Sequence, residues 1–285
     1  MRGERGWAAH AVPGTAVKRA AIVLAAALAA CANPAAHVPP FARQPYQAFS
    51  RQAVVALTLR EWKTFGSPVD DAPPTPRPPK AAADMAERQE GLWQRVGEYW
   101  WLGQDAGTRE SRWTGKHDEN GRVFASDDDE AYAWSAAFVS YIMRMAGAGS
   151  HFPYAPAHHV YIDAAKLMAM HKTTGWAVTA ERLELYAPVP GDLICYSRTA
   201  QPLTYDDLPA GRFAAHCDIV VATGRDQIAV IGGNVDDAVT MKHVPVTLDG
   251  RLAGLDRPLL DTRYPWFVAL RLIGAGPSPV VATAP

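Results

Sequence analysis

The fold of this chain centres on residues 131–147, AYAWSAAFVSYIMRMAG. The apolar side chains of this stretch recur at intervals of three and four residues, which places them on one side of a helix. They are Trp134, Ala137, Phe138, Tyr141, Ile142 and Met145. We therefore predict a central helix that packs against the main core.

Acidic residues precede this helix. Ser126 with Asp129 three positions later is the pattern of a capping box, and the acidic run 127–130 suits the positive end of a helix dipole. Ser135 then lies near the front of the helix. Two interpretations of Ser135 stay open at this point, namely a nucleophile or a small residue chosen for close helix packing.

The composition is that of an ordinary globular protein. The 285 residues are 48% hydrophobic and 20% charged, with a formal net charge of −1. Such a balanced chain has no field that gathers polyanions, and no basic stripe is interleaved with aromatics, so we expect no nucleic-acid partner. Nothing in the sequence indicates a cofactor.

Residues 1–31 are predicted to be an export signal, since basic residues precede an apolar run that ends in small residues before Cys31. The last four residues, Leu-Ala-Ala-Cys, resemble the lipobox of bacterial lipoproteins, which implies lipidation of Cys31 and a membrane anchor through it. Ala32 after the cysteine favours the periplasmic face of the outer membrane. Residues 32–44, rich in Pro and Ala, are predicted to be a spacer.

The spacing of apolar residues changes half-way along the mature chain, from helical intervals to strand-like runs. Helical spacing is expected over 46–65, 87–103 and 157–171, and short strands over 192–196, 216–221, 227–231, 239–246 and 266–272. Helices followed by a run of strands predict an α+β fold with an antiparallel sheet. We assign the domain to 45–273, with a helical extension over 45–103, and a flexible tail to 274–285.

The remaining cysteines and the histidines admit simple interpretations. Cys195 and Cys217 lie in strand-like runs, so a disulfide and a pair of buried thiols both remain open. Four histidines follow the central helix: His151, His158, His159 and His171. They lack the HExxH spacing and a matching carboxylate or cysteine, so we predict no metal site.

The order of motifs resembles the cysteine- and histidine-dependent amidohydrolase/peptidase (CHAP) domains and their NlpC-type relatives, which cleave amide bonds in bacterial cell walls. The shared pattern is WSAAF, then Pro-Gly-Asp at 190–192, then the His-led strand HCDIVV, then Gly-Gly-Asn at 232–234. The resemblance implies a papain-like α+β domain with helices packed on an antiparallel, barrel-like sheet. It also implies peptidoglycan or a cell-wall peptide as the partner.

Residue by residue, the resemblance puts the nucleophile on Ser135, the general base on His216 and the orienting polar residue on Asn234. It makes Trp134, Asp192 and Gly233 candidates for the substrate cleft. The combination of EWKTFGSP, EYWWLG, WSAAFVSYIMRMAGAG, FPYAPAHHVYI and HCDIVV resembles a family of bacterial lipoprotein domains of unknown function, over residues 44–273.

Ser135 stands where the amidase pattern has cysteine. A thiol beside a histidine ionises readily, whereas a hydroxyl must lose its proton to the base during attack. Two hypotheses therefore compete. The domain is either a non-catalytic module that binds at the cell wall, or a serine-dependent amidohydrolase or peptidase that uses Ser135, His216 and Asn234.

Overall fold

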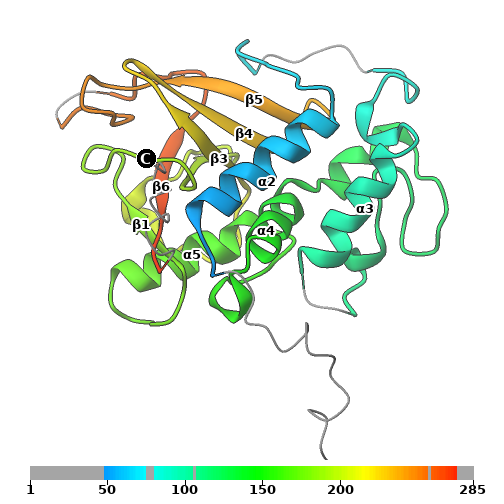
Figure 1. Cartoon of the computed structure of the whole chain (residues 1–285), viewed down its shortest axis with the longest axis horizontal. Coiled ribbons are helices and arrows are strands. Elements are labelled where there is room, and N and C mark those ends of the chain that lie inside the picture. Colours follow the sequence, from blue (N-terminus) through cyan, green and yellow to red (C-terminus); the bar gives the residue numbers. More distant parts are fainter. Residues whose placement is uncertain (1–47, 75–79, 105–106, 256–257, 275–285) are drawn as a thin grey trace, which may run out of the picture. The chain divides into compact units, whose positions relative to one another are not determined.

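A six-stranded antiparallel sheet forms the centre of the computed structural model (Figure 1). The structure describes residues 48–74, 80–104, 107–255 and 258–274. The predicted signal, Cys31 and the spacer lie outside these residues, as does the tail beyond residue 274. Among the described residues, no helix is long and apolar enough to cross a membrane.

The strands follow the order β1-β6-β2-β3-β4-β5 across the sheet. Their bounds are β1 Val178–Glu181, β2 Leu193–Ser197, β3 Ala215–Thr223, β4 Gln227–Val235, β5 Ala238–Pro245 and β6 Trp266–Leu272. The antiparallel sheet and the α+β class are confirmed. Strand β1 was not predicted, because its four residues are too few to give an alternating pattern.

The expected barrel-like closure is wrong, since β1 pairs only with β6 and β5 only with β4 in the sheet. The free edge of β5 is instead covered by residues 68–70. Met241 N donates to Pro68 O at 3.0 Å, and Asp70 N donates to Met241 O at 2.9 Å. This short segment occupies backbone N–H and C=O groups of β5 that would have paired with β1 if the sheet had closed into a barrel.

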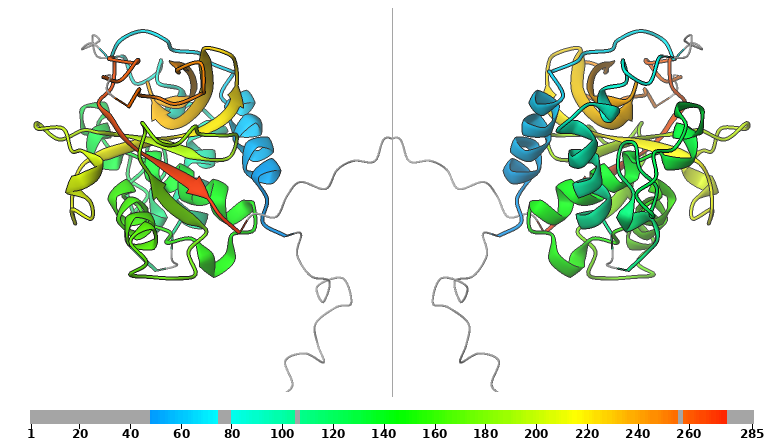
Figure 2. Two further views of the ribbon diagram at one scale, coloured as in Figure 1. Left: turned by 90° about the vertical axis from the view of Figure 1, so that its left-hand side faces the viewer. Right: turned by 90° about the vertical axis from the view of Figure 1, so that its right-hand side faces the viewer.

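Four described α-helices accompany the sheet: α2 Arg51–Thr64, α3 Leu92–Leu102, α4 Ser135–Met145 and α5 His158–Ala169. Helix α2 packs on β3, β4 and β5, α4 on β3 and β4, and α5 on β1 and β3, while α3 packs on the outside of α4. Helices α4 and α5 thus lie on one side of the sheet, and the segment after β5 lies on the other (Figure 2).

The central helix is confirmed as α4, and every residue from Ser135 to Met143 in it is buried. Its start differs from the prediction. Residues Ser126–Tyr132 form a separate 3-10 helix, and Trp134 is the N-cap of α4. The acidic residues therefore do not cap α4. One of them, Asp129, instead pairs with Arg88 at 2.5 Å.

Strand β3 is buried on both faces, which makes it the core of the sheet. Because side chains alternate along a strand, Cys217 and Ile219 face the helices, while Asp218 and Val220 face the other way. Cys217 is the register partner of Cys195 on β2, and the two are joined by a disulfide with their Cα atoms 4.1 Å apart.

Removing this disulfide is expected to lower the stability of the domain. The bridge spans 22 residues of chain, and closing a loop of that size restricts the unfolded state by about 3 kcal/mol. The variant Cys195→Ala/Cys217→Ala should therefore unfold at lower urea concentration than the oxidised wild type. Wild type treated with a reductant should shift in the same direction. A double variant within about 1 kcal/mol of the oxidised wild type would contradict this expectation.

Candidate functional site

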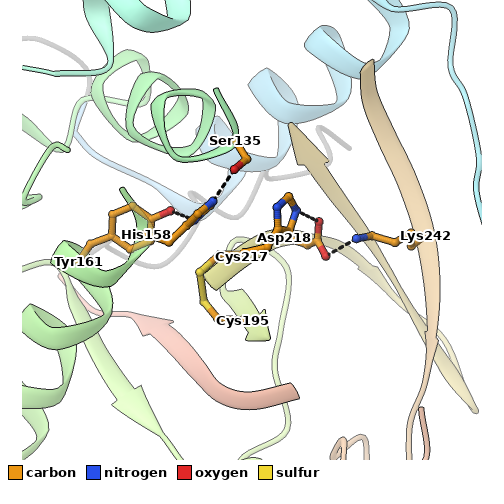
Figure 3. Close-up of a disulfide and its surroundings, with 8 residues drawn as sticks. Ser135, His158, Tyr161, Cys195, Cys217, Asp218 and Lys242 are labelled. Carbon is orange, nitrogen blue, oxygen red and sulfur yellow. Dashed lines mark hydrogen bonds and ion pairs between the residues drawn. A yellow bond between two sulfur atoms is a disulfide. The ribbon is translucent and has the colours of Figure 1, made fainter. Parts of the chain in front are cut away.

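Ser135 is the first residue of α4, and its hydroxyl meets a histidine from the next helix. Its Oγ lies 2.7 Å from Nε2 of His158, the first residue of α5. Nδ1 of the same ring is hydrogen-bonded to the hydroxyl of Tyr161, one turn further along α5 (Figure 3). Ser135 is only 7% exposed. The partner predicted for Ser135 was His216, but the structure has His158 in that place.

The Tyr161 hydroxyl is the hydrogen-bond partner of one ring nitrogen of His158. Burial raises the pKa of Tyr161 well above its ordinary value, so the hydroxyl keeps its proton. Within the described part of the chain its hydrogen-bond partner is Nδ1 of His158, to which it can donate. If the Tyr161 hydroxyl donates to Nδ1, then Nε2–H donates to the Oγ of Ser135.

His158 is also held in its neutral form. Burial, reinforced by the nearby His216, lowers the pKa of His158 well below its ordinary value. A neutral ring whose Nε2 bears the hydrogen has no lone pair there with which to take the proton of Ser135. In this arrangement the Ser135–His158 contact is a satisfied hydrogen bond between two helix starts and not a nucleophile poised beside its base.

His216 lies on β3 beside His158 but bonds to a different partner. The two imidazole centroids are 5.3 Å apart. Nε2 of His216 lies 3.1 Å from Oδ1 of Asp218, and the other oxygen of Asp218 forms an ion pair with Nζ of Lys242 at 2.8 Å (Figure 3). The side chains of Asp218 and Lys242 are 0% exposed, and that of His216 is 4% exposed.

His216, Asp218 and Lys242 form a buried row, and the charges of Asp218 and His216 follow from the shifts in their pKa values. Burial acts to raise the pKa of Asp218, but Lys242 and His216 outweigh it and hold the pKa at about 2. Burial lowers the pKa of His216, although Asp218 acts in the opposite direction. At neutral pH, Asp218 is therefore an ionised carboxylate that accepts a hydrogen from a neutral His216.

Two glycines of β4 make room for these contacts. A Cβ on Gly232 would lie 2.0 Å from Oδ1 of Asp218 and 2.7 Å from Nε2 of His216. A Cβ on Gly233 would lie 2.6 Å from Cβ and Cγ of Phe138 on α4. Gly233 was predicted as a cleft residue, but its contact with α4 gives it a packing role.

A cavity of about 540 Å³ lies beside His216. Its lining includes Tyr196, Arg198 and Asn234 as well as His216, whereas Ser135 is not among the described residues that line it. The predicted trio is thus split. His216 and Asn234 share the cavity, and Ser135 lies outside it with His158.

Asn234 has φ +54°, in the left-handed region that short polar side chains tolerate. It does not hydrogen-bond to either histidine in the part of the chain that the structure describes. The hydrogen bonds to the two imidazoles come from other residues, Tyr161 for His158 and Asp218 for His216, while the role predicted for Asn234 stays a prediction.

Trp134 and Asp192, the other two predicted cleft residues, are buried. Trp134 is 1% exposed, and its Nε1 donates to the carboxyl of Glu87. Asp192 is 0% exposed and accepts hydrogen bonds from Arg51 at 2.6 Å, from the Tyr186 hydroxyl at 2.7 Å and from a backbone N–H of β6. Both side chains are buried and hydrogen-bonded, and neither is among the described residues that line the cavity beside His216.

Sequence reasoning missed four residues of this region, although each carries a signal. His158 and Tyr161 are three apart on a helix, which puts them on one face. Asp218 is two residues after His216, and strand alternation puts them on the same face of β3. Lys242 is a cation within a mostly apolar strand, which indicates a buried partner.

Within the described ranges, no group of three or more His, Cys, Asp or Glu residues is arranged to hold a metal ion.

Comparison with known proteins identifies one family. Residues 87–272 match the model of a family described as uncharacterized proteins conserved in bacteria (DUF2272). The match begins after α2 and includes α4, α5 and all six strands. No curated protein and no solved structure matches the chain. Because the match covers well over half of the sequence, the chain belongs to the DUF2272 family of uncharacterized bacterial proteins.

Proposed function

We propose that this protein is a lipid-anchored envelope protein whose domain binds cell-wall peptide without cleaving it. The predicted export signal and the lipobox ending at Cys31 support a tether to the periplasmic face of the outer membrane. The motif order that resembles CHAP and NlpC-type domains supports a papain-like relationship, with peptidoglycan or a cell-wall peptide as the partner.

One observation carries the non-catalytic part of this proposal. The Ser135 hydroxyl is buried against His158, and Ser135 is not among the described residues that line the cavity beside His216. A serine needs an adjacent acceptor for its proton before it can attack a carbonyl. The cavity is therefore better suited to holding a ligand than to cleaving one.

The cavity offers the contacts that a peptide needs. Arg198 has a side chain that is 47% exposed, and a guanidinium binds carboxylates in a bidentate manner. Tyr196 contributes an aromatic wall, and the ion pair between Asp236 and Lys80, 2.8 Å long, adds polar groups at the cavity. Cell-wall peptides carry both free carboxylates and amines, which fits this mixed lining.

Binding can be tested by sedimentation of the purified protein with purified sacculi. Wild type is expected to sediment with sacculi and to release no soluble fragments. Arg198→Ala should weaken binding ~10-fold, because it removes a charge-assisted contact. The matched control is Arg225→Ala in the exposed β3–β4 turn, which removes the same charge away from the cavity. No retention of wild type, or equal retention of the two variants, would count against the proposal.

The second candidate function is a serine-dependent hydrolase, favoured by the 2.7 Å contact between Ser135 and His158 at the start of a helix. If His158 adopted the other tautomer, Nε2 could take the proton of Ser135 as its oxygen attacked an amide carbonyl, and pass it to the leaving amine. Backbone N–H groups of the first turn of α4 would stabilise the oxyanion.

A fluorophosphonate probe separates the two candidates, because it labels only an activated serine. The binding proposal expects no labelling of wild type and no release of fragments from sacculi. Labelling of wild type that disappears in Ser135→Ala and in His158→Gln would instead support the hydrolase. Loss of labelling in His216→Ala as well would extend the mechanism to the base expected from the family resemblance.

A further inference from the structure

The buried row His216–Asp218–Lys242 is built into the sheet across three strands. His216 and Asp218 come from β3, Lys242 comes from β5, and β4 runs between them. The ion pair can cross β4 because Gly232 has no side chain, whereas a Cβ there would lie 2.0 Å from the Asp218 carboxylate. A buried ion pair carries a large desolvation cost, so its use beside a cavity calls for an explanation other than stability.

Asp218 fixes the tautomer of His216. Because the pKa of Asp218 is about 2, its carboxylate can only accept, and the hydrogen of the neutral imidazole lies on Nε2. The second nitrogen, Nδ1, is then an acceptor. It has no hydrogen-bond partner among the described residues, and the His216 side chain lines the cavity.

We propose that Nδ1 of His216 is the acceptor that contacts the ligand in this cavity, and that Asp218 and Lys242 are the residues that position it. The ligand then presents an N–H donor, an amide or an ammonium, to His216, with its carboxylate within reach of Arg198. This inference rests on the proposed peptide-binding function and specifies the peptide end that the cavity recognises.

The neighbours of His216 support a fixed and neutral acceptor. Asp218 and Lys242 face it from β3 and β5, Arg198 follows β2, and His158 lies on α5. The negative charge of Asp218 is balanced by Lys242, so it orients the ring without forcing a second proton onto it.

The test uses the full protein labelled with ¹⁵N-histidine, with purified sacculi and a synthetic cell-wall stem peptide as probes. The ring resonances of His216, assigned by comparison with His216→Phe, should report Nε2–H and an unprotonated Nδ1. Addition of the stem peptide should shift the Nδ1 resonance. His216→Phe should sediment with sacculi at least ~10-fold less well than wild type, whereas the control His159→Phe on α5 should bind normally.

The positioning role has its own variant, Asp218→Asn/Lys242→Met, which removes both charges and keeps an acceptor near Nε2. A mixture of ring tautomers and weaker binding are expected, and a pure Nε2–H ring in this variant would overturn the role of the pair. A wild-type ring with hydrogen on Nδ1 would overturn the acceptor role, without requiring any variant to fold. Binding by His216→Phe equal to wild type would overturn the inference and leave the proposed function intact. Absence of wild-type binding would overturn both.

Discussion

The variant Glu87→Gln is expected to be more stable than wild type by about 4 kcal/mol at pH 8. Glu87 is 3% exposed, and burial, with Asp129 and Asp237 nearby, raises its pKa to about 8. The folded protein therefore holds a proton that the unfolded chain, with an ordinary pKa of 4.5, has released. Stability falls as the pH rises from 4.5 towards 8, and glutamine removes this loss because it cannot ionise.

Urea denaturation at pH 5 and pH 8 measures this effect. At pH 5 the two proteins should differ by less than about 1 kcal/mol, because the unfolded chain is then partly protonated too. Glutamine keeps the acceptor that the indole N–H of Trp134 uses. The control is Glu130→Gln, because the Glu130 side chain is 91% exposed. This variant should show the same difference in stability between pH 5 and pH 8 as wild type. A Glu87→Gln protein with the wild-type pH dependence would show that Glu87 is ionised in the fold.

The helices and strands were largely predictable, because their apolar residues recur at clear helical or strand-like intervals. The apolar spacing of 131–147 predicted α4, and the strand-like runs after residue 190 predicted the other five strands but not β1. The start of α4 was not predictable from the acidic run, since Asp129 is engaged by Arg88, a residue 41 positions away. The open sheet was not predicted because it also depends on a long-range contact. Residues 68–70 cover the edge of β5, far from them in the sequence.

The candidate site was predictable only in part, because its contacts are long-range. The position of Ser135 at a helix start followed from local pattern. Its partner did not, since His158 and His216 are both histidines near the ends of apolar elements, and only the packing of α5 on β3 decides which one reaches Ser135. The role of Gly233 was likewise decided by Phe138 on another element.

Lys242→Met is expected to destabilise the protein by about 3–5 kcal/mol at pH 7. The side chains of Lys242 and Asp218 are 0% exposed, so removing the ammonium leaves a buried carboxylate whose remaining side-chain partner among the described residues is His216. Unfolding would release that carboxylate into water. The double variant Asp218→Asn/Lys242→Met removes both charges and should recover most of the loss, because no unpaired charge then remains.

The pH dependence distinguishes this explanation from a simple packing defect. In wild type, the pKa of Asp218 is depressed to about 2, so its stabilising contribution is present above pH 3.8 and is lost as the pH falls towards 2. Burial raises the pKa of Asp218, and both Lys242 and His216 lower it. Without Lys242, the pKa of Asp218 should therefore rise. Protonation then relieves the unpaired charge, so the stability deficit of Lys242→Met should shrink between pH 7 and pH 4. A packing defect would persist across this range in both the single and the double variant, and urea denaturation at the two pH values decides between them.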